Sequence, residues 1–169
     1  IKFCAKCMQS IADQYFVNNS LDIYHIQNRT RHLTLSKSSF STVKQRFIII
    51  KFIRDFFWDN KFIEAETPVL QEIAGGALAI PFSTMYESRK KEFFLKIAPE
   101  LYLKRLIITG FNRIFEISRN FRNEGVSAYH NPEFTMLEAY CTSFNLTDMI
   151  QLIDNFLKLV SRFILNTFE

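Results

Sequence analysis

Side-chain character alternates along residues 113–124, RIFEISRNFRNE, and this alternation limits the possible folds more than any other feature of the chain. Apolar side chains stand at odd positions, such as Phe115, Ile117 and Phe121. From position 116 onward the even positions are polar, and they are Glu116, Ser118, Asn120, Arg122 and Glu124. Successive side chains of a β-strand point to opposite faces. The pattern therefore predicts a strand with one face for packing and one for polar chemistry.

A second strand with the same property is predicted shortly afterwards, in the segment PEFTMLEAY at 132–140. Its alternate side chains Phe134, Met136, Glu138 and Tyr140 share a face. The two strands are expected to pair as an antiparallel hairpin. The connection GVSAYHN at 125–131 is longer than the two-residue loops that make the tightest turns. A loop of this length can fold over a ligand.

Five further elements are predicted from apolar periodicity and from residues that begin or end helices. They are a strand at 1–8, a helix at about 41–60, a strand at 61–70 that stops at Pro68, a helix at 99–109, and a long helix from Asn145 capped by Asp148. Asn60 is expected to take the left-handed position at the end of the first helix. The apolar stripe of the last helix is interpreted as core packing.

The composition favours one packed domain, because 48% of the 169 residues are apolar and 15% are aromatic. The most apolar run, FIIIKFIRDFF, contains Lys51, Arg54 and Asp55, and nothing approaches the ~20 apolar residues that cross a membrane. We expect a soluble protein in the cytoplasm, with an organelle matrix as the alternative. The first residue, Ile1, follows no initiator Met and no signal peptide, which suggests a piece of a larger protein.

Cysteine number and charge give weaker indications. Cys4, Cys7 and Cys141 are too few for a disulfide framework, which fits a reducing compartment. Cys4 and Cys7 form a CxxC without a second ligand pair, so they are interpreted as strand residues rather than zinc ligands. Residues 23–54 hold seven Lys or Arg and no acidic residue. This excess suits either a polyanion such as nucleic acid or a solvated helix face.

The polar residues of the hairpin suit a nucleotide and an amine bound side by side. An arginine such as Arg122 can hold a phosphate or carboxylate through two hydrogen bonds, and the ring of Phe134 can stack on a base. The carboxylates of Glu124 and Glu138 can receive ammonium groups. A purely structural hairpin, in which Arg122 and Glu124 form a surface pair and Phe134 faces a core, fits the pattern equally well.

Two long stretches carry a resemblance to a known family. FEISRNFRNEGVSAYHNPEFTMLEAY at 115–140 resembles the second signature motif of class II aminoacyl-tRNA synthetases, and specifically of lysyl-tRNA synthetases. VKQRFIIIKFIRDFFWDNKFIEAETPVL at 43–70 resembles the first motif, a helix and strand through which these enzymes form homodimers. Four shorter stretches also match: GGALAIPFSTMY at 75–86, IAPELYLKRLIITGF at 97–111, NRTRHL at 28–33 and IKFCAKCMQSIA at 1–12.

The resemblance covers about residues 22–165 and implies an α+β fold, with an antiparallel sheet flanked by helices. It implies that residues 1–20 are the C-terminal end of an OB-fold anticodon-binding domain and its linker. Residues 21–169 would then be the first part of the class II catalytic domain. The family activates lysine with ATP to lysyl-adenylate and passes the lysyl group to tRNA(Lys), with Mg²⁺ as a cofactor.

The site residues follow from the resemblance, position by position. Arg122 is the expected catalytic residue, and it holds the α-phosphate of ATP and the carboxylate of lysine. The other expected ATP-binding residues are Glu124, His130, Asn131 and Phe134. The other expected lysine-binding residues are Gly76, Glu100, Glu138 and Tyr140. No metal ligand is expected within the chain, because the family's Mg²⁺ ligands and third motif lie further downstream, so we expect these residues to be inactive alone.

Two positions depart from the family pattern, and other functions remain possible. Ile80 and Tyr129 stand where the family often has basic residues, which puts some phosphate or tRNA contacts in question. The nearest alternative enzyme is the lysyltransferase that modifies elongation factor P. Aspartyl- and asparaginyl-tRNA synthetases share the PEFT core, but Glu100 and Glu138 suit an acidic substrate poorly. A non-catalytic dimerisation remnant is the alternative outside enzymes.

Overall fold

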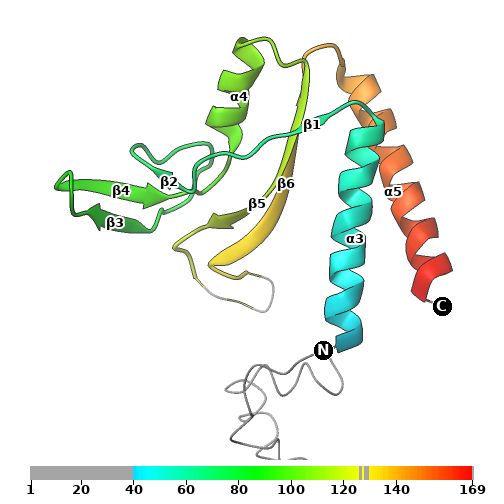
Figure 1. Cartoon of the computed structure of the whole chain (residues 1–169), viewed down its shortest axis with the longest axis horizontal. Helices are drawn as coiled ribbons and strands as arrows, with labels where there is room; N and C mark the ends of the chain where they lie inside the picture. The colour runs from blue at the N-terminus through cyan, green and yellow to red at the C-terminus, as the bar shows by residue number, and fades with distance from the viewer. Residues whose placement is uncertain (1–39, 126, 128–129, 169) are drawn as a thin grey trace, which may run out of the picture. The chain divides into compact units, whose positions relative to one another are not determined.

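The computed structural model describes residues 40–125, 127 and 130–168. The predicted strand at 1–8, the pair Cys4 and Cys7, the domain boundary at residue 20 and much of the basic segment lie outside these residues. The elements are α3 (Phe40–Asp59), β1 (Ile63–Glu64), β2 (Leu70–Gln71), β3 (Ser83–Tyr86), β4 (Lys91–Leu95), α4 (Glu100–Ile108), β5 (Arg113–Phe121), β6 (Glu133–Cys141) and α5 (Leu146–Phe168) (Figure 1). Contacts divide the chain near Ile50, within α3, and the packing described below is that of the unit from Lys51 to Thr167.

The predicted hairpin is confirmed. β5 and β6 pair antiparallel along their whole length, from Arg113 opposite Cys141 to Phe121 opposite Glu133. They are the longest strands in Figure 1, and β1 joins the other edge of β5 in parallel. A second, smaller sheet has the order β2-β4-β3 and is antiparallel. The combination of helices with largely antiparallel sheets is the α+β arrangement that the sequence predicts.

The apolar face of β5 packs on helices. Phe115 is fully buried, and its ring stacks on Phe57 of α3 with 5.0 Å between the ring centroids. Phe62 is also fully buried and meets Phe57 edge-on. Leu152 of α5 belongs to the same cluster, in the part of Figure 1 where α5 runs beside α3. The odd positions Phe115 and Ile117 of β5 thus contribute to the packing face, as predicted, whereas Phe121 is not part of this core cluster.

The helix ends mostly follow their sequence signals. At the start of α5 the Asn145 side chain accepts from the Asp148 backbone N–H, and Asp148 accepts from that of Asn145, both at 3.0 Å. This reciprocal cap confirms the prediction. At the end of α3 the prediction for Asn60 is wrong, because Lys61 takes the positive φ, at 67°. The Asn60 side chain instead donates to the Phe56 carbonyl at 2.8 Å.

The predicted strand at 61–70 is largely wrong in its extent. Pairing with β5 covers Ile63 and Glu64 and adds a hydrogen bond from Ala65 N to Phe115 O of 2.8 Å. It stops there because the Thr67 backbone N–H donates to the Glu116 side chain and Pro68 has no N–H.

In the part of the chain that the structure describes, no helix has the length and apolar character to cross a membrane.

Candidate functional site

The site residues lie on the face of the hairpin opposite the phenylalanine core. The pairing places Glu116 opposite Glu138 and Asn120 opposite Phe134. Directly opposed residues on paired strands project to the same side. The even positions of β5 therefore share a face with Phe134, Glu138 and Tyr140 of β6. The predicted polar face is real, but it is not open throughout, because Glu116 and Asn120 are buried.

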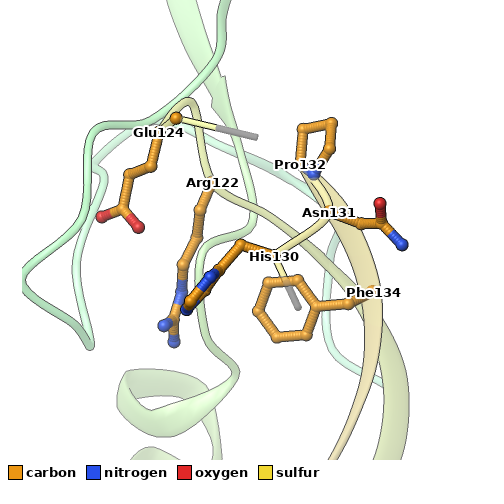
Figure 2. A pocket seen from close by; sticks show the side chains of 7 residues that line it. Arg122, Glu124, His130, Asn131, Pro132 and Phe134 are labelled. Carbon is orange, nitrogen blue, oxygen red and sulfur yellow. The ribbon is translucent and has the colours of Figure 1, made fainter. Parts of the chain in front are cut away.

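A pocket of about 300 Å³ lies at the loop end of this face. Its lining consists of Arg122, Glu124, Gly125, His130, Asn131, Pro132 and Phe134 (Figure 2). The Arg122 guanidinium carbon lies 5.1 Å from the centroid of the Phe134 ring. Among the described residues nothing accepts a hydrogen bond from the buried Arg122 Nε. The pocket therefore combines a guanidinium with an aromatic face, which suits a planar, anionic ligand.

Main-chain hydrogen bonds hold the rim of the pocket. Arg122 N donates to Pro132 O at 2.9 Å, which extends the hairpin by one step beyond β5. Asn123 N donates to Ile80 O at 2.7 Å and thereby joins the rim to a separate segment of the chain. The Ser127 hydroxyl and His130 Nδ1 lie 2.7 Å apart. Tyr129, one of the two departures from the family pattern, lies outside the described residues.

The predicted ATP residues do not all point into the pocket. In Figure 2 the Arg122 guanidinium and the His130 and Phe134 rings lie close together, and the Glu124 carboxylate lies to one side of them. The Asn131 side chain points away from Arg122. Asn131 lines the pocket, but its amide does not face the same space as the other polar groups. Their roles as ATP ligands stay predictions.

Glu138 and Tyr140 form an acidic end of the same face. The Tyr140 hydroxyl donates to Glu138 Oε2 at 3.2 Å. Burial raises the pKa of Glu138 above its usual value of 4.5, against the lowering effect of this hydrogen bond, and the charges of Glu100 and Glu116 raise it further. Burial and the neighbouring Glu138 raise the pKa of Tyr140 as well. The pair therefore presents a partly desolvated carboxylate with a phenol that keeps its proton.

Gly76 and Glu100 are brought together at the start of α4. Gly76 has a φ of 91°, and a Cβ there would lie 3.2 Å from the Cβ atoms of both Ala98 and Glu100. Glycine is needed here for both its backbone angle and the close approach. Glu100 pairs with Lys104 at 2.5 Å, and the Lys104 side chain is 54% exposed. Exposed pairs one helical turn apart contribute little stability, so an ammonium ligand can replace Lys104.

The sequence reasoning missed a buried cluster below this acidic end. Lys96 Nζ lies 2.7 Å from Glu116 Oε1, and both side chains are almost completely buried, at 1% and 3% exposure. The Thr67 hydroxyl donates to Glu116 Oε2 at 2.8 Å. One signal was present in the sequence: Glu116 stands between Phe115 and Ile117, and a carboxylate in such a strand requires a partner.

The family implies Mg²⁺, but the described residues do not make a site for it. They contain no group of three or more His, Cys, Asp or Glu side chains that could hold a metal ion. Glu124 is the one carboxylate in the lining of the pocket. A single carboxylate is too few ligands to define a Mg²⁺ site. The described residues therefore do not make a Mg²⁺ site by themselves.

The fold agrees with comparisons to known proteins. The sequence-family model described as tRNA synthetases class II (D, K and N) matches residues 23–168. The chain belongs to this family, and its α+β arrangement is part of the class II synthetase fold.

The curated proteins similar to this chain include several lysine–tRNA ligases. The chain is 48% identical over 161 residues to the lysine–tRNA ligase of Buchnera aphidicola subsp. Acyrthosiphon pisum (strain APS). The matched region covers 94% of the chain and 31% of that protein. It is 50% identical over 144 residues to that of Baumannia cicadellinicola subsp. Homalodisca coagulata, covering 84% of the chain and 28% of that protein. It is 44% identical over 160 residues to that of Idiomarina loihiensis, covering 94% of the chain and 31% of that protein. The chain thus spans about a third of the length of these relatives.

Proposed function

We propose that the chain is part of a lysine–tRNA ligase, which activates lysine with ATP and transfers the lysyl group to tRNA(Lys). The observation that carries the proposal is the charge arrangement along one face of the β5–β6 hairpin. The Arg122–Phe134 pocket at one end suits an adenine nucleotide. Glu138 and Tyr140 at the other end suit an amine, and the charge of Glu100 acts on Glu138 as well. Adenylation of lysine requires both ligands side by side.

The first step needs positioning and charge neutralisation rather than a protein nucleophile. A carboxylate oxygen of lysine attacks the α-phosphorus of ATP, a new P–O bond forms, and the bond to the bridging oxygen breaks as pyrophosphate leaves with its electron pair. Arg122 brings the two anions together and neutralises the charge that concentrates between them. Phe134 holds the adenine by stacking.

The second step transfers the activated acyl group. A hydroxyl of the 3′-terminal ribose of tRNA attacks the lysyl carbonyl carbon, AMP departs with the electron pair of the broken bond, and the hydroxyl proton is lost. Glu100 is proposed to hold the α-ammonium, beside the main chain at Gly76. Glu138 and Tyr140 are proposed to hold the ε-ammonium throughout. An analogue without that ammonium leaves a desolvated carboxylate unpaired, and sites of this kind can discriminate by about 10⁴ or more.

ATP–pyrophosphate exchange on the full-length gene product tests the proposal, with lysine, aspartate and asparagine compared. Lysine-dependent exchange followed by lysylation of tRNA is expected. Exchange with lysine but no acylation of tRNA would favour the elongation factor P lysyltransferase. The absence of exchange with any amino acid would favour a dimerisation remnant. These 169 residues alone are expected to give no exchange, because they supply one wall of the proposed site.

A homodimer through α3 and β1 is the proposed assembly. The proposal rests on the resemblance to the first class II motif, and two exposed apolar side chains are compatible with it. Trp58 at the end of α3 is 50% exposed, and Ile63 of β1 is 45% exposed. Sedimentation equilibrium of the full-length protein with Trp58→Asp tests the interface, and a monomer is expected. An unchanged dimer would place the contact elsewhere.

A further inference from the structure

Lys96 and Glu116 form a buried ion pair in which every donor of the ammonium is used. Lys96 Nζ donates to Glu116 Oε1 at 2.7 Å, to the Thr67 hydroxyl at 3.1 Å and to the Thr67 carbonyl at 3.3 Å. Glu116 also accepts from the Thr67 hydroxyl, at 2.8 Å to Oε2. Apolar residues of similar volume often replace such pairs without loss of stability. Stability alone therefore does not explain why this pair is present.

The position of the pair relates it to the acidic end of the site. Glu116 lies directly opposite Glu138 in the β5–β6 pairing. Side chains at opposed positions stand about 4.5–5.5 Å apart at Cβ, where two like charges repel. The groups that act electrostatically on Glu138 are Tyr140 on its own strand, Glu116 and Arg122 from β5 and its end, and Glu100 from α4. Glu116 is thus the β5 carboxylate that acts on Glu138, and it is the ion-pair partner of Lys96.

The balance of charges around Glu138 indicates a role for the Lys96–Glu116 pair. Three carboxylates lie in or beside the acidic end, and they are Glu100, Glu116 and Glu138. The substrate lysine carries two ammonium groups. With Lys96 fixed on Glu116, one carboxylate remains for each ammonium of the substrate. Without Lys96 the buried carboxylate would be uncompensated beside Glu138 and would disfavour the ionised form of Glu138.

We propose that Lys96 and Glu116 are positioning residues for amino-acid binding: Lys96 offsets the charge of Glu116 in part, which favours the ionised form of Glu138 that receives the side-chain ammonium of the substrate. This inference rests on the proposed function. Lys96 also has a main-chain link to the site, because Lys96 O accepts from Phe121 N at 2.8 Å, next to Arg122. The residue thus lies between the two ends of the proposed site.

The pH dependence of lysine binding to the full-length gene product tests the inference, by calorimetry from pH 5 to 8. Lysine affinity falls on acidification, and the pH range of this fall is the acid limb. In Lys96→Met the acid limb is expected to shift to higher pH by about one unit or more, because Glu116 loses its cation. Lysine KM at neutral pH should rise while ATP KM stays unchanged. Lys96→Arg should keep the wild-type limb. The double variant Lys96→Met/Glu116→Gln should return the limb to the wild-type position or below it.

A matched control separates this effect from a general loss of a lysine. Lys91→Met also removes an ammonium, at the start of β4, but Lys91 pairs at the surface with Glu72 at 2.8 Å and should leave the limb unchanged. An unmoved limb in Lys96→Met, or a limb still displaced in the double variant, would overturn the inference. If Lys96→Met fails to fold, Glu116→Gln decides instead. The ammonium of Lys96 then lacks its carboxylate and should move the limb to lower pH, whereas an unmoved limb in Glu116→Gln would overturn the inference. If wild-type protein does not bind lysine at all, the proposed function and the inference both fail.

Discussion

The guanidinium of Arg122 lies over the ring of Phe134, 5.1 Å from its centroid, where the chain leaves β5 and enters β6. The two residues come from opposite strands, and the antiparallel pairing of the hairpin fixes their distance. The proposed adenine site on Phe134 therefore lies beside a cation. This arrangement leads to the first of four predictions, all of which are made for the full-length gene product.

Arg122→Ala is expected to lower lysine-dependent ATP–pyrophosphate exchange by roughly 10²- to 10³-fold, the scale for losing one group that stabilises transition-state charge. Arg122→Lys should recover little, because an ammonium lacks the two-pronged geometry of a guanidinium. Arg119→Ala is the control. Arg119 is 57% exposed and 3.7 Å from Glu133, so its removal should have little effect. Near-normal exchange in Arg122→Ala would rule out the role assigned to Arg122.

Glu138→Gln is expected to raise the Kd of lysine about 10- to 100-fold, the scale of one hydrogen bond to a charged group. ATP binding should be largely kept, because Glu138 does not line the nucleotide pocket. Isothermal titration with each ligand measures both effects. Glu133→Gln, an exposed carboxylate on the same strand, provides the control. Equal loss of lysine and ATP binding would contradict the assignment.

Lysine affinity is expected to fall on acidification at a higher pH than an ordinary glutamate would give. Burial raises the pKa of Glu138 above 4.5, and the protonated carboxyl no longer attracts an ammonium. Its contribution to stability has the opposite sign, because a raised folded-state pKa means that the folded protein binds the proton more tightly. Stability from this group therefore rises as pH falls from its folded pKa toward 4.5. Titrations of lysine Kd and of urea unfolding across pH 4.5–8 check both directions, and Glu138→Gln should remove both.

Gly76→Ala is expected to reduce both stability and lysine affinity. The positive φ costs about 1–2 kcal/mol for a residue with a side chain, and the new Cβ presses on Glu100. Gly110→Ala is the matched control, because Gly110 has a φ of 109° and a Cβ added there would have no atom within 4 Å. Both variants should lose stability in urea unfolding, whereas only Gly76→Ala should bind lysine more weakly. A similar loss of lysine affinity in both would show that Gly76 acts through stability alone.

The sequence predicted those parts of the fold whose signals are local. The alternation around Phe115 identified the hairpin and its packing face, and the polar pair at Asn145 and Asp148 identified the start of α5. The strand at 61–70 was overestimated because the partner of Thr67, Glu116, is 49 residues away in the chain. No local pattern reports a hydrogen bond of that kind.

The site was predicted unevenly for the same reason. Arg122, His130 and Phe134 were expected together because they belong to one hairpin, and the structure places them together. The direction of the Asn131 side chain depends on loop geometry that the residue types do not fix. Lys96 was missed because a lysine next to an apolar run normally lies at the surface, and its burial depends on Glu116 of another strand.

The rim of the Arg122–Phe134 pocket is joined to the segment before β3 through Asn123 N and Ile80 O, two main-chain atoms. The Ile80 side chain takes no part in this bond and is 61% exposed. Evolution can therefore exchange the residue at position 80, including a basic one for an apolar one, without displacing the rim. The affinity of that surface for phosphate groups can drift in one lineage while the shape of the pocket is inherited unchanged.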